Sequence, residues 1–100
     1  VPPDATAPAA PSNPSVTNVT QTTLTITWID NSNNEAGFTI QRATNSAFTT
    51  GLVSINVVPN VTSYNDSGLA RKTKYFYRVL AFNVNFTSAW SPTLNVTTKK

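Results

Sequence analysis

The chain has 100 residues, which is enough for one domain with a single hydrophobic core. It contains no cysteine and no histidine, which excludes disulfides, thiolate metal sites and the commonest general base. Four acidic and seven basic residues give a net charge of +3, with too few cations for a nucleic-acid surface. No apolar run approaches the roughly 20 residues that cross a membrane. We therefore expect no cofactor, no nucleic-acid partner and no membrane insertion.

The first 14 residues, VPPDATAPAAPSNP, carry five of the seven prolines. Proline fixes the backbone and removes hydrogen-bond donors, and the Ala, Ser and Thr around it have little to bury, which is typical of a semi-rigid linker. We predict a linker over residues 1–12, a domain over residues 13–98 and a short tail at residues 99–100. Because the chain begins at Val1 instead of Met, we interpret it as a piece of a longer multidomain protein.

Beyond the linker, apolar and polar residues alternate with a period of two, which is typical of half-buried strands. In TLTITW, for example, Leu24, Ile26 and Trp28 fall on one face and the threonines on the other. Short strands at roughly ten-residue spacing predict an all-β sandwich of two antiparallel sheets. The seven expected strands lie at residues 15–19, 23–28, 37–42, 52–58, 63–65, 74–83 and 92–98.

The segment SYNDSGLARKTKYFYRVLAFN resembles the region around the fifth and sixth strands of fibronectin type III domains. The usual pattern there is Ser-Tyr-x-Asp-x-Gly-Leu, a turn, and then Tyr-x-Tyr-Arg-Val-x-Ala-x-Asn, which residues 63–69 and 75–83 reproduce. The resemblance extends to Trp28 and to SAWS at residues 88–91, and it covers about residues 13–98. It implies the seven-stranded, immunoglobulin-like sandwich of that family.

The resemblance also implies roles for three structural residues. Tyr75 would form the tyrosine corner, with its hydroxyl bonded to the chain a few residues upstream and its ring on Leu69. Trp28 would anchor the core where disulfide-bearing relatives have a bridge. The chain departs from the family at Arg71, where proline is common, and in NVNFTSAWS, which lacks the glycine common in that loop. We expect the fold to tolerate both differences.

Six consecutive oxygen-bearing side chains, DNSNNE at residues 30–35, raise the question of a metal or catalytic site. An EF-hand loop that starts at Asp30 would need a glycine and a bidentate glutamate where this chain has Glu35 and Gln41. A weaker calcium site with Asp30 and Glu35 is the alternative. A glycosidase pair would lie across a cleft, whereas both acids fall in one short loop. We interpret the stretch as a turn, because Asn and Asp cap local backbone groups, and we expect no metal site and no catalytic residue.

The strand predicted at residues 74–83 carries an apolar stripe on its outward face. If its two tyrosines point inward, then Phe76, Leu80 and Phe82 point outward together with Arg78. Leu80 stands where the family often has a charged residue. However, more than half of any protein surface is apolar, and the Arg78 stem could cover part of the stripe. The stripe is therefore either an interaction surface or ordinary surface.

Two further aromatic residues, Phe86 and Trp90, lie in the loop before the last strand. They could stack on a sugar ring, or they could pack against the domain, as an aromatic before this serine ordinarily does in the family. Integrin-binding members carry an Arg-Gly-Asp triplet in this loop, which this chain lacks, so that activity is not carried over. The five Asn-x-Ser/Thr sequons follow from the abundance of Asn, Ser and Thr; they start at Asn18, Asn60, Asn65, Asn85 and Asn95.

Taken together, these observations predict a non-catalytic extracellular module of a secreted or cell-surface multidomain protein, which the resemblance suggests is prokaryotic. The module would act as a spacer or docking platform beside neighbouring domains of the same chain, and we expect it to be a monomer. The alternative is a ligand-binding module for a protein or polysaccharide. That module would use the outer face of the sheet formed by the third, sixth and seventh strands, or the loop between the last two strands.

Overall fold

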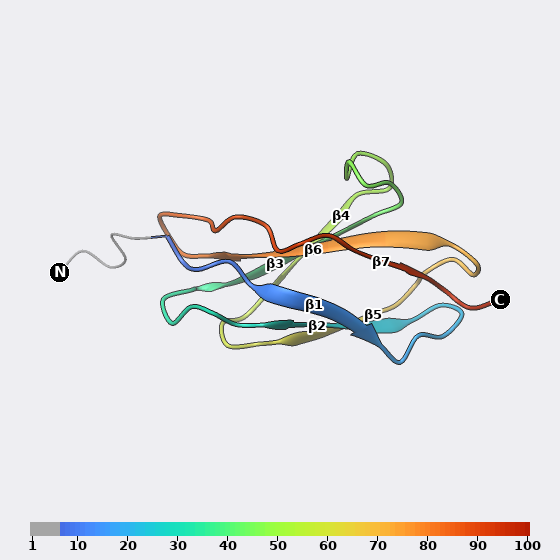
Figure 1. Cartoon of the computed structure of the whole chain (residues 1–100), viewed down its shortest axis with the longest axis horizontal. Helices are drawn as coiled ribbons and strands as arrows, with labels where there is room; N and C mark the ends of the chain where they lie inside the picture. Colours follow the sequence, from blue (N-terminus) through green and yellow to red (C-terminus); the bar gives the residue numbers. More distant parts are fainter. Residues whose placement is uncertain (1–6) are drawn as a thin grey trace.

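The computed structural model describes residues 7–100, which form seven strands in two antiparallel sheets (Figure 1). One sheet has the order β1-β2-β5 and the other the order β4-β3-β6-β7. The predicted all-β sandwich with seven strands is therefore confirmed. Over residues 7–100, no helix is long and apolar enough to cross a membrane. The strands are β1 (Ser12–Thr17), β2 (Leu24–Ile29), β3 (Gly37–Ala43), β4 (Val53–Val57), β5 (Ser63–Asp66), β6 (Lys74–Phe82) and β7 (Leu94–Thr97).

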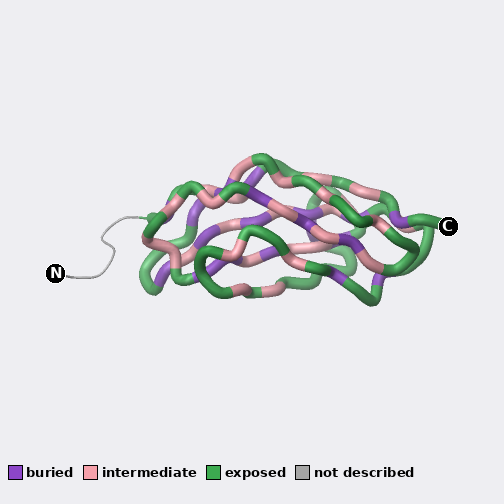
Figure 2. Tube along the Cα trace, turned by 90° about the horizontal axis from the view of Figure 1, so that it is seen from below, coloured by how far each residue is buried: buried purple, intermediate pink, exposed green. Residues whose placement is uncertain are grey.

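The core lies between the two sheets and follows the alternation of the sequence. Along β2 and β6, buried positions alternate with more exposed ones, and buried and partly exposed segments follow one another along the chain in Figure 2. The Trp28 ring of β2 packs on the Phe38 ring of β3 with their centroids 5.6 Å apart. Burying these aromatic and aliphatic side chains is the main driving force for a domain of this size. The core comprises Leu24, Ile26, Trp28, Phe38, Ile40, Leu69, Tyr75, Tyr77, Val79 and Ala81.

The register of the four-stranded sheet determines which side chains share its outer face. On β3 and β6, Gln41 lies opposite Arg78 and Thr39 lies opposite Leu80. On the far side of β3, Ser54 and Asn56 of β4 lie opposite Gln41 and Thr39. Since successive residues of a strand point to opposite faces, these side chains form two rows across the outer face.

The first strand begins earlier than predicted, at Ser12 instead of residue 15. The register of β1 against β2 shifts between Ser12 and Ser15, where Asn13 has a φ of 49°. Such a bulge at a sheet edge tolerates Pro14, which has no N–H for the ladder. The proline-rich composition therefore concealed the start of the strand.

The end of the predicted linker packs against the sandwich. Pro8 and Pro11 are buried, and the Asn31 side chain donates 2.9 Å hydrogen bonds to the Ala10 carbonyl and to Ser12 Oγ. Residues 1–6 of the predicted linker lie outside the described residues. The start of the described chain and the C-terminus lie at opposite ends of the sandwich (Figure 1).

Candidate functional site

The outer face of β6 presents the apolar stripe that the alternation predicts. The inward residues Tyr75, Tyr77, Val79 and Ala81 are buried, whereas the outward residues are all partly exposed. These outward residues between Lys74 and the strand end are Phe76, Arg78, Leu80 and Phe82. Three apolar side chains and one arginine therefore occupy one face of a single strand.

Arg78 is the centre of this face because two aromatic rings enclose it. Its guanidinium carbon lies 4.1 Å from the ring centroid of Phe48 and 4.1 Å from that of Trp90. Arg78 Nε and Nη2 donate to Gln41 Oε1 at 3.0 and 2.7 Å, and Gln41 Nε2 donates to Ser54 Oγ at 3.1 Å. Burial among these groups lowers the pKa of Arg78. A guanidinium still stays charged and suits flat stacking on rings, so this is a two-sided cation–π contact.

Phe48 reaches Arg78 from the loop between β3 and β4, in a conformation that is uncommon for a bulky residue. Its φ is 57°, in the left-handed region, and yet its side chain is buried. The Asn45 carboxamide holds the loop by accepting hydrogen bonds from the Thr49 and Thr50 N–H groups at 3.0 and 3.1 Å. The stack on Arg78 offsets the strain of this backbone. Sequence reasoning missed Phe48; a lone aromatic within a polar loop was the available signal.

Trp90 is positioned by the serines on either side of it. The Ser88 and Ser91 N–H groups donate to the Ala81 and Val79 carbonyls at 2.8 and 2.7 Å. Their hydroxyls accept hydrogen bonds from the N–H groups of the same two residues, at 2.9 and 3.0 Å. The SAWS segment therefore runs along β6 before β7 begins, and it places the Trp90 ring over Arg78.

Phe86 lies at the tip of the loop between β6 and β7 and is 41% exposed. Asn83 closes this loop: its Oδ1 accepts hydrogen bonds from the Asn85 and Phe86 N–H groups at 3.0 and 2.9 Å. The Asn83 N–H donates to the Phe86 carbonyl at 2.8 Å. An asparagine side chain thus shapes the loop from which the usual glycine is missing.

Phe82, at the end of the stripe, covers Gly37 of β3. A Cβ at Gly37 would lie 2.9 Å from Phe82 Cζ and 2.3 Å from the Val57 carbonyl oxygen. At the other end of the stripe, Lys74 Nζ lies 5.4 Å from the Phe76 ring centroid. At one end of the stripe Phe82 therefore covers Gly37, and at the other end Lys74 lies beside Phe76. Arg78 lies between these two ends.

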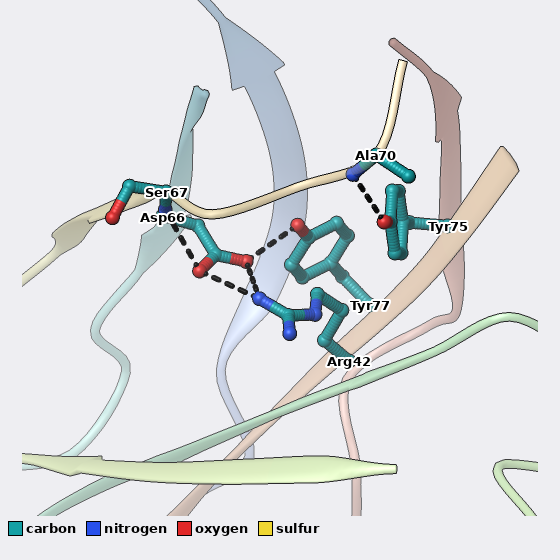
Figure 3. Close-up of polar contacts among 6 residues, drawn as sticks. All are labelled: Arg42, Asp66, Ser67, Ala70, Tyr75 and Tyr77. Atoms are coloured by element: carbon teal, nitrogen blue, oxygen red, sulfur yellow. Dashed lines mark hydrogen bonds and ion pairs between the residues drawn. The ribbon is translucent and has the colours of Figure 1, made fainter. Parts of the chain in front are cut away.

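The three predicted structural residues lie in the core. Trp28 and Leu69 are each 4% exposed, and Tyr75 is 8% exposed. The Ala70 N–H donates a 2.8 Å hydrogen bond to the Tyr75 hydroxyl, five residues downstream, which is the geometry of a tyrosine corner (Figure 3).

A buried ion pair between the sheets was not foreseen from the sequence. Arg42 Nη1 of β3 donates to both carboxylate oxygens of Asp66 on β5 at 2.9 Å, and the Tyr77 hydroxyl donates to Asp66 Oδ2 at 2.7 Å (Figure 3). Burial and then the hydrogen bond to Asp66 raise the pKa of Tyr77. Burial opposes charge on Arg42, but the hydrogen bond and the charge of Asp66 raise its pKa. Asp66 was visible in the family pattern; its partner Arg42 was not.

The DNSNNE stretch forms a turn whose side chains bond to one another, to the backbone of the turn and to neighbouring segments of the chain. Asp30 Oδ1 accepts from the Ser32 N–H at 3.0 Å, and Glu35 accepts from Ser32 Oγ at 2.8 Å and from the Asn60 N–H at 3.0 Å. Burial would raise the pKa of Glu35, but these hydrogen bonds lower it below its usual 4.5. Over residues 7–100, no three His, Cys, Asp or Glu residues gather as metal ligands, and no pocket is present.

Comparison with known proteins identifies one family of domains. A sequence model of the fibronectin type III domain matches residues 9–97. Contactin-6 of Rattus norvegicus and of Homo sapiens are each 37% identical over 75 residues, which are 75% of this chain and 7% of contactin-6. The solved FN1–FN3 domains of chicken CNTN1 superpose with a TM-score of 0.79 at 22% identity, over 90% of this chain and 30% of that chain.

The chain thus spans less than a tenth of the curated relatives that it matches. The family match covers the sandwich from before β1 to the end of β7. Both sheets, the tyrosine corner and the family motif at residues 63–69 lie within the matched part. The chain belongs to the fibronectin type III domain family.

Proposed function

We propose that this chain is a non-catalytic extracellular module that acts as a spacer or docking platform in a multidomain protein. The observation that carries the proposal is the placement of the chain ends. The described chain starts at one end of the sandwich and finishes at the other, so that modules joined in series extend lengthwise (Figure 1). The match to only 7% of contactin-6 supports a role as one module among many.

The outer face of β6 supports the docking part of the proposal. Phe76, Leu80 and Phe82 are partly exposed along one strand of the sheet, near the exposed Phe86. A strand advances about 3.3 Å per residue, so the stripe from Phe76 to Phe82 extends roughly 20 Å. An apolar patch of that length suits contact with a neighbouring domain of the same chain.

The test is Leu80→Lys in a longer stretch of the parent protein that includes the neighbouring domains. Since Leu80 points outward, the free energy of unfolding of the isolated domain should change by only about 0.5 kcal/mol. Protection of the adjoining linkers against proteolysis should fall. Thr17→Lys on exposed β1 is the matched control and should leave the protection unchanged. Equal protection in both variants would refute docking through this face and leave the spacer role.

A second candidate function is ligand binding through the loop between β6 and β7. Phe86 is 41% exposed and Val84 is 78% exposed at this tip, which is a common arrangement for contact with a sugar ring or an apolar side chain. Trp90 uses one ring face on Arg78 and offers less surface. In a pull-down with insoluble polysaccharides, Phe86→Ala should abolish retention and Trp90→Ala should weaken it less. Absence of retention for the unchanged domain would refute polysaccharide binding.

A further inference from the structure

The two sheets end in four edge strands, which differ in how well they are protected against pairing with another chain. β1 carries Pro14 and a bulge, both of which interrupt a continuous ladder. β5 and β7 have four residues each; β5 ends at the ion-paired Asp66 and β7 is followed closely by Lys99 and Lys100. Short length and charge both discourage pairing. β4 is one residue longer than β5 and β7 and has no proline, no bulge and no charge.

β4 lies at the edge of the four-stranded sheet, where β3 is its one neighbour in the described sheet. Its five residues, VSINV, contain no proline and no charge, and no charged residue occurs anywhere between Arg42 and Asp66. The strand and its flanks also expose apolar surface: Leu52 is 45% exposed, Val53 38% and Val58 67%. An apolar, uncharged edge with unpaired backbone groups is a template for an added strand.

The sequence around β4 is close to symmetric about Ile55. In an antiparallel pair of two copies centred there, Val53 lies opposite Val57 of the second copy, and Ser54 lies opposite Asn56. The valines and Ile55 share the inward face, since their partners on β3 are the inward Arg42, Phe38 and Ile40. Ser54 and Asn56 share the outer face. Apolar residues therefore meet apolar residues and polar residues meet polar residues.

The distribution of charge favours the antiparallel arrangement. Five exposed cations gather at one end of the sandwich, where the Lys72 N–H donates to the Lys99 carbonyl; they are Arg71, Lys72, Lys74, Lys99 and Lys100. Asp30 and Glu35 lie in the loop between β2 and β3, at the opposite end (Figure 1). Two copies that pair antiparallel lie with their long axes reversed, so the acidic end of each lies alongside the basic end of the other.

We propose that β4 is a docking edge for a second copy of this chain, which pairs antiparallel about Ile55 and joins the two four-stranded sheets into one. The occupant is a second copy for two reasons. The residue pattern of β4 matches itself in the antiparallel direction, and the basic end of one copy lies beside the acidic end of the other. The contact is small, so the pair forms at high local concentration, such as several copies held on one surface, and dilute chains remain monomers.

Sedimentation velocity from micromolar to millimolar concentration tests the proposal. The mean mass should rise from 10.8 kDa towards twice that value, and less so at high salt, where the opposed charges are screened. Backbone amide exchange gives a second readout that needs no variant. Amides of β4 that point away from β3 should exchange more slowly as concentration rises, whereas those of β1 should not change. A constant mean mass and constant amide exchange would overturn the proposal. The edge of β4 would then be open only to a strand from another protein.

Charged substitutions at the outward residues of β4 test whether β4 is the strand that pairs. In Ser54→Lys/Asn56→Lys, lysines of the two copies lie opposite each other and should keep the chain monomeric; Ser54→Glu/Asn56→Glu should do the same. An equimolar mixture of the two variants should pair again. Asn95→Lys/Thr97→Lys, on the other edge of the same sheet, is the matched control and should associate like the unchanged chain. If the Ser54→Lys/Asn56→Lys variant still associates, or the mixture does not, pairing through β4 is refuted.

Discussion

The phenolic hydroxyl of Tyr77 donates a 2.7 Å hydrogen bond to Asp66 Oδ2 and so joins β6 of one sheet to β5 of the other. The same carboxylate accepts two hydrogen bonds from Arg42 Nη1, which adds β3 to the connection. The Asp66 side chain is 4% exposed and that of Arg42 is 16% exposed, so this is a largely buried ion pair. Its residues connect the two sheets beside the apolar core, to which Tyr77 belongs.

Asp66→Asn should destabilise the domain by about 3 kcal/mol, because it leaves the Arg42 guanidinium buried without its counter-charge. Tyr77→Phe removes one hydrogen bond to a charged group and keeps the ion pair, so we expect a loss of about 1.5–3 kcal/mol. Urea denaturation measures both losses. Asp30→Asn, in the turn between β2 and β3, is the control for loss of a carboxylate. An Asp66→Asn loss no larger than that of the control would contradict the role of the ion pair.

Tyr75→Phe should cost about 1–3 kcal/mol, because the Ala70 N–H loses its acceptor in a largely buried corner. Tyr64→Phe is the matched comparison, since Tyr64 lies outside this corner and its side chain is partly exposed. Thermal melting of the two variants gives the difference. Equal shifts in melting temperature would mean that the hydroxyl of Tyr75 has no special structural role.

The stack of Arg78 on Trp90 should appear as a coupling between the two residues. In a double-mutant cycle of Arg78→Ala and Trp90→Ala, we expect a coupling free energy of about 0.5–2 kcal/mol, the range for a partly desolvated cation–π contact. Arg78→Lys keeps the charge but lacks the flat guanidinium that lies between two rings. It should therefore lose most of the coupling. Additive losses in the cycle would show that the stacking is incidental.

Alanine substitutions at two glycines compare the free-energy cost of a steric clash with that of backbone strain. Gly37→Ala places a Cβ 2.3 Å from the Val57 carbonyl oxygen, so β4 must move, and we expect a loss of about 3 kcal/mol. Gly68→Ala meets nothing within 4 Å but must adopt a φ of 71°, which costs about 1 kcal/mol. Chemical denaturation should rank the losses in that order. The reverse order would show that β4 moves away from the added Cβ at little cost in free energy.

Glu35 should contribute a dependence of stability on acidic pH. Its pKa is lower in the folded chain than its usual 4.5, so folding favours the ionised form. The contribution is complete above the pKa of the unfolded chain and is lost as the pH falls through the folded pKa. Between neutral pH and strongly acidic pH, the free energy of unfolding should therefore decrease less in Glu35→Gln than in the unchanged chain. Parallel curves would show that the bonds from Ser32 and Asn60 do not favour the carboxylate.

The sequence by itself determined the class of fold and the face of most strands. In β2 and most of β3, apolar residues alternate with polar ones, because each strand has one face in the core and one outside, and a shift by one residue would exchange them. In β6, large apolar residues stand on both faces, and the family motif indicated which of them point inward. The motif at residues 63–69 and the tyrosine of the corner are local in the chain, so a single sequence displays them together. β1 shows the limit of this reasoning, because a bulge and Pro14 interrupt its alternation.

The tertiary structure alone decided which distant side chains meet. Arg42 and Asp66 are 24 residues apart, and Phe48, Arg78 and Gln41 come from different elements, so no local pattern relates them. Phe48 adopts a left-handed backbone that its side chain disfavours, and it does so in a loop held by Asn45 and with its ring on Arg78. The exposed edge of β4 likewise depends on strand order, because the residues of β4 alone do not indicate whether it has one neighbouring strand or two. These contacts arise from packing between sheets and loops, where the free energy depends on partners that lie far apart in the chain.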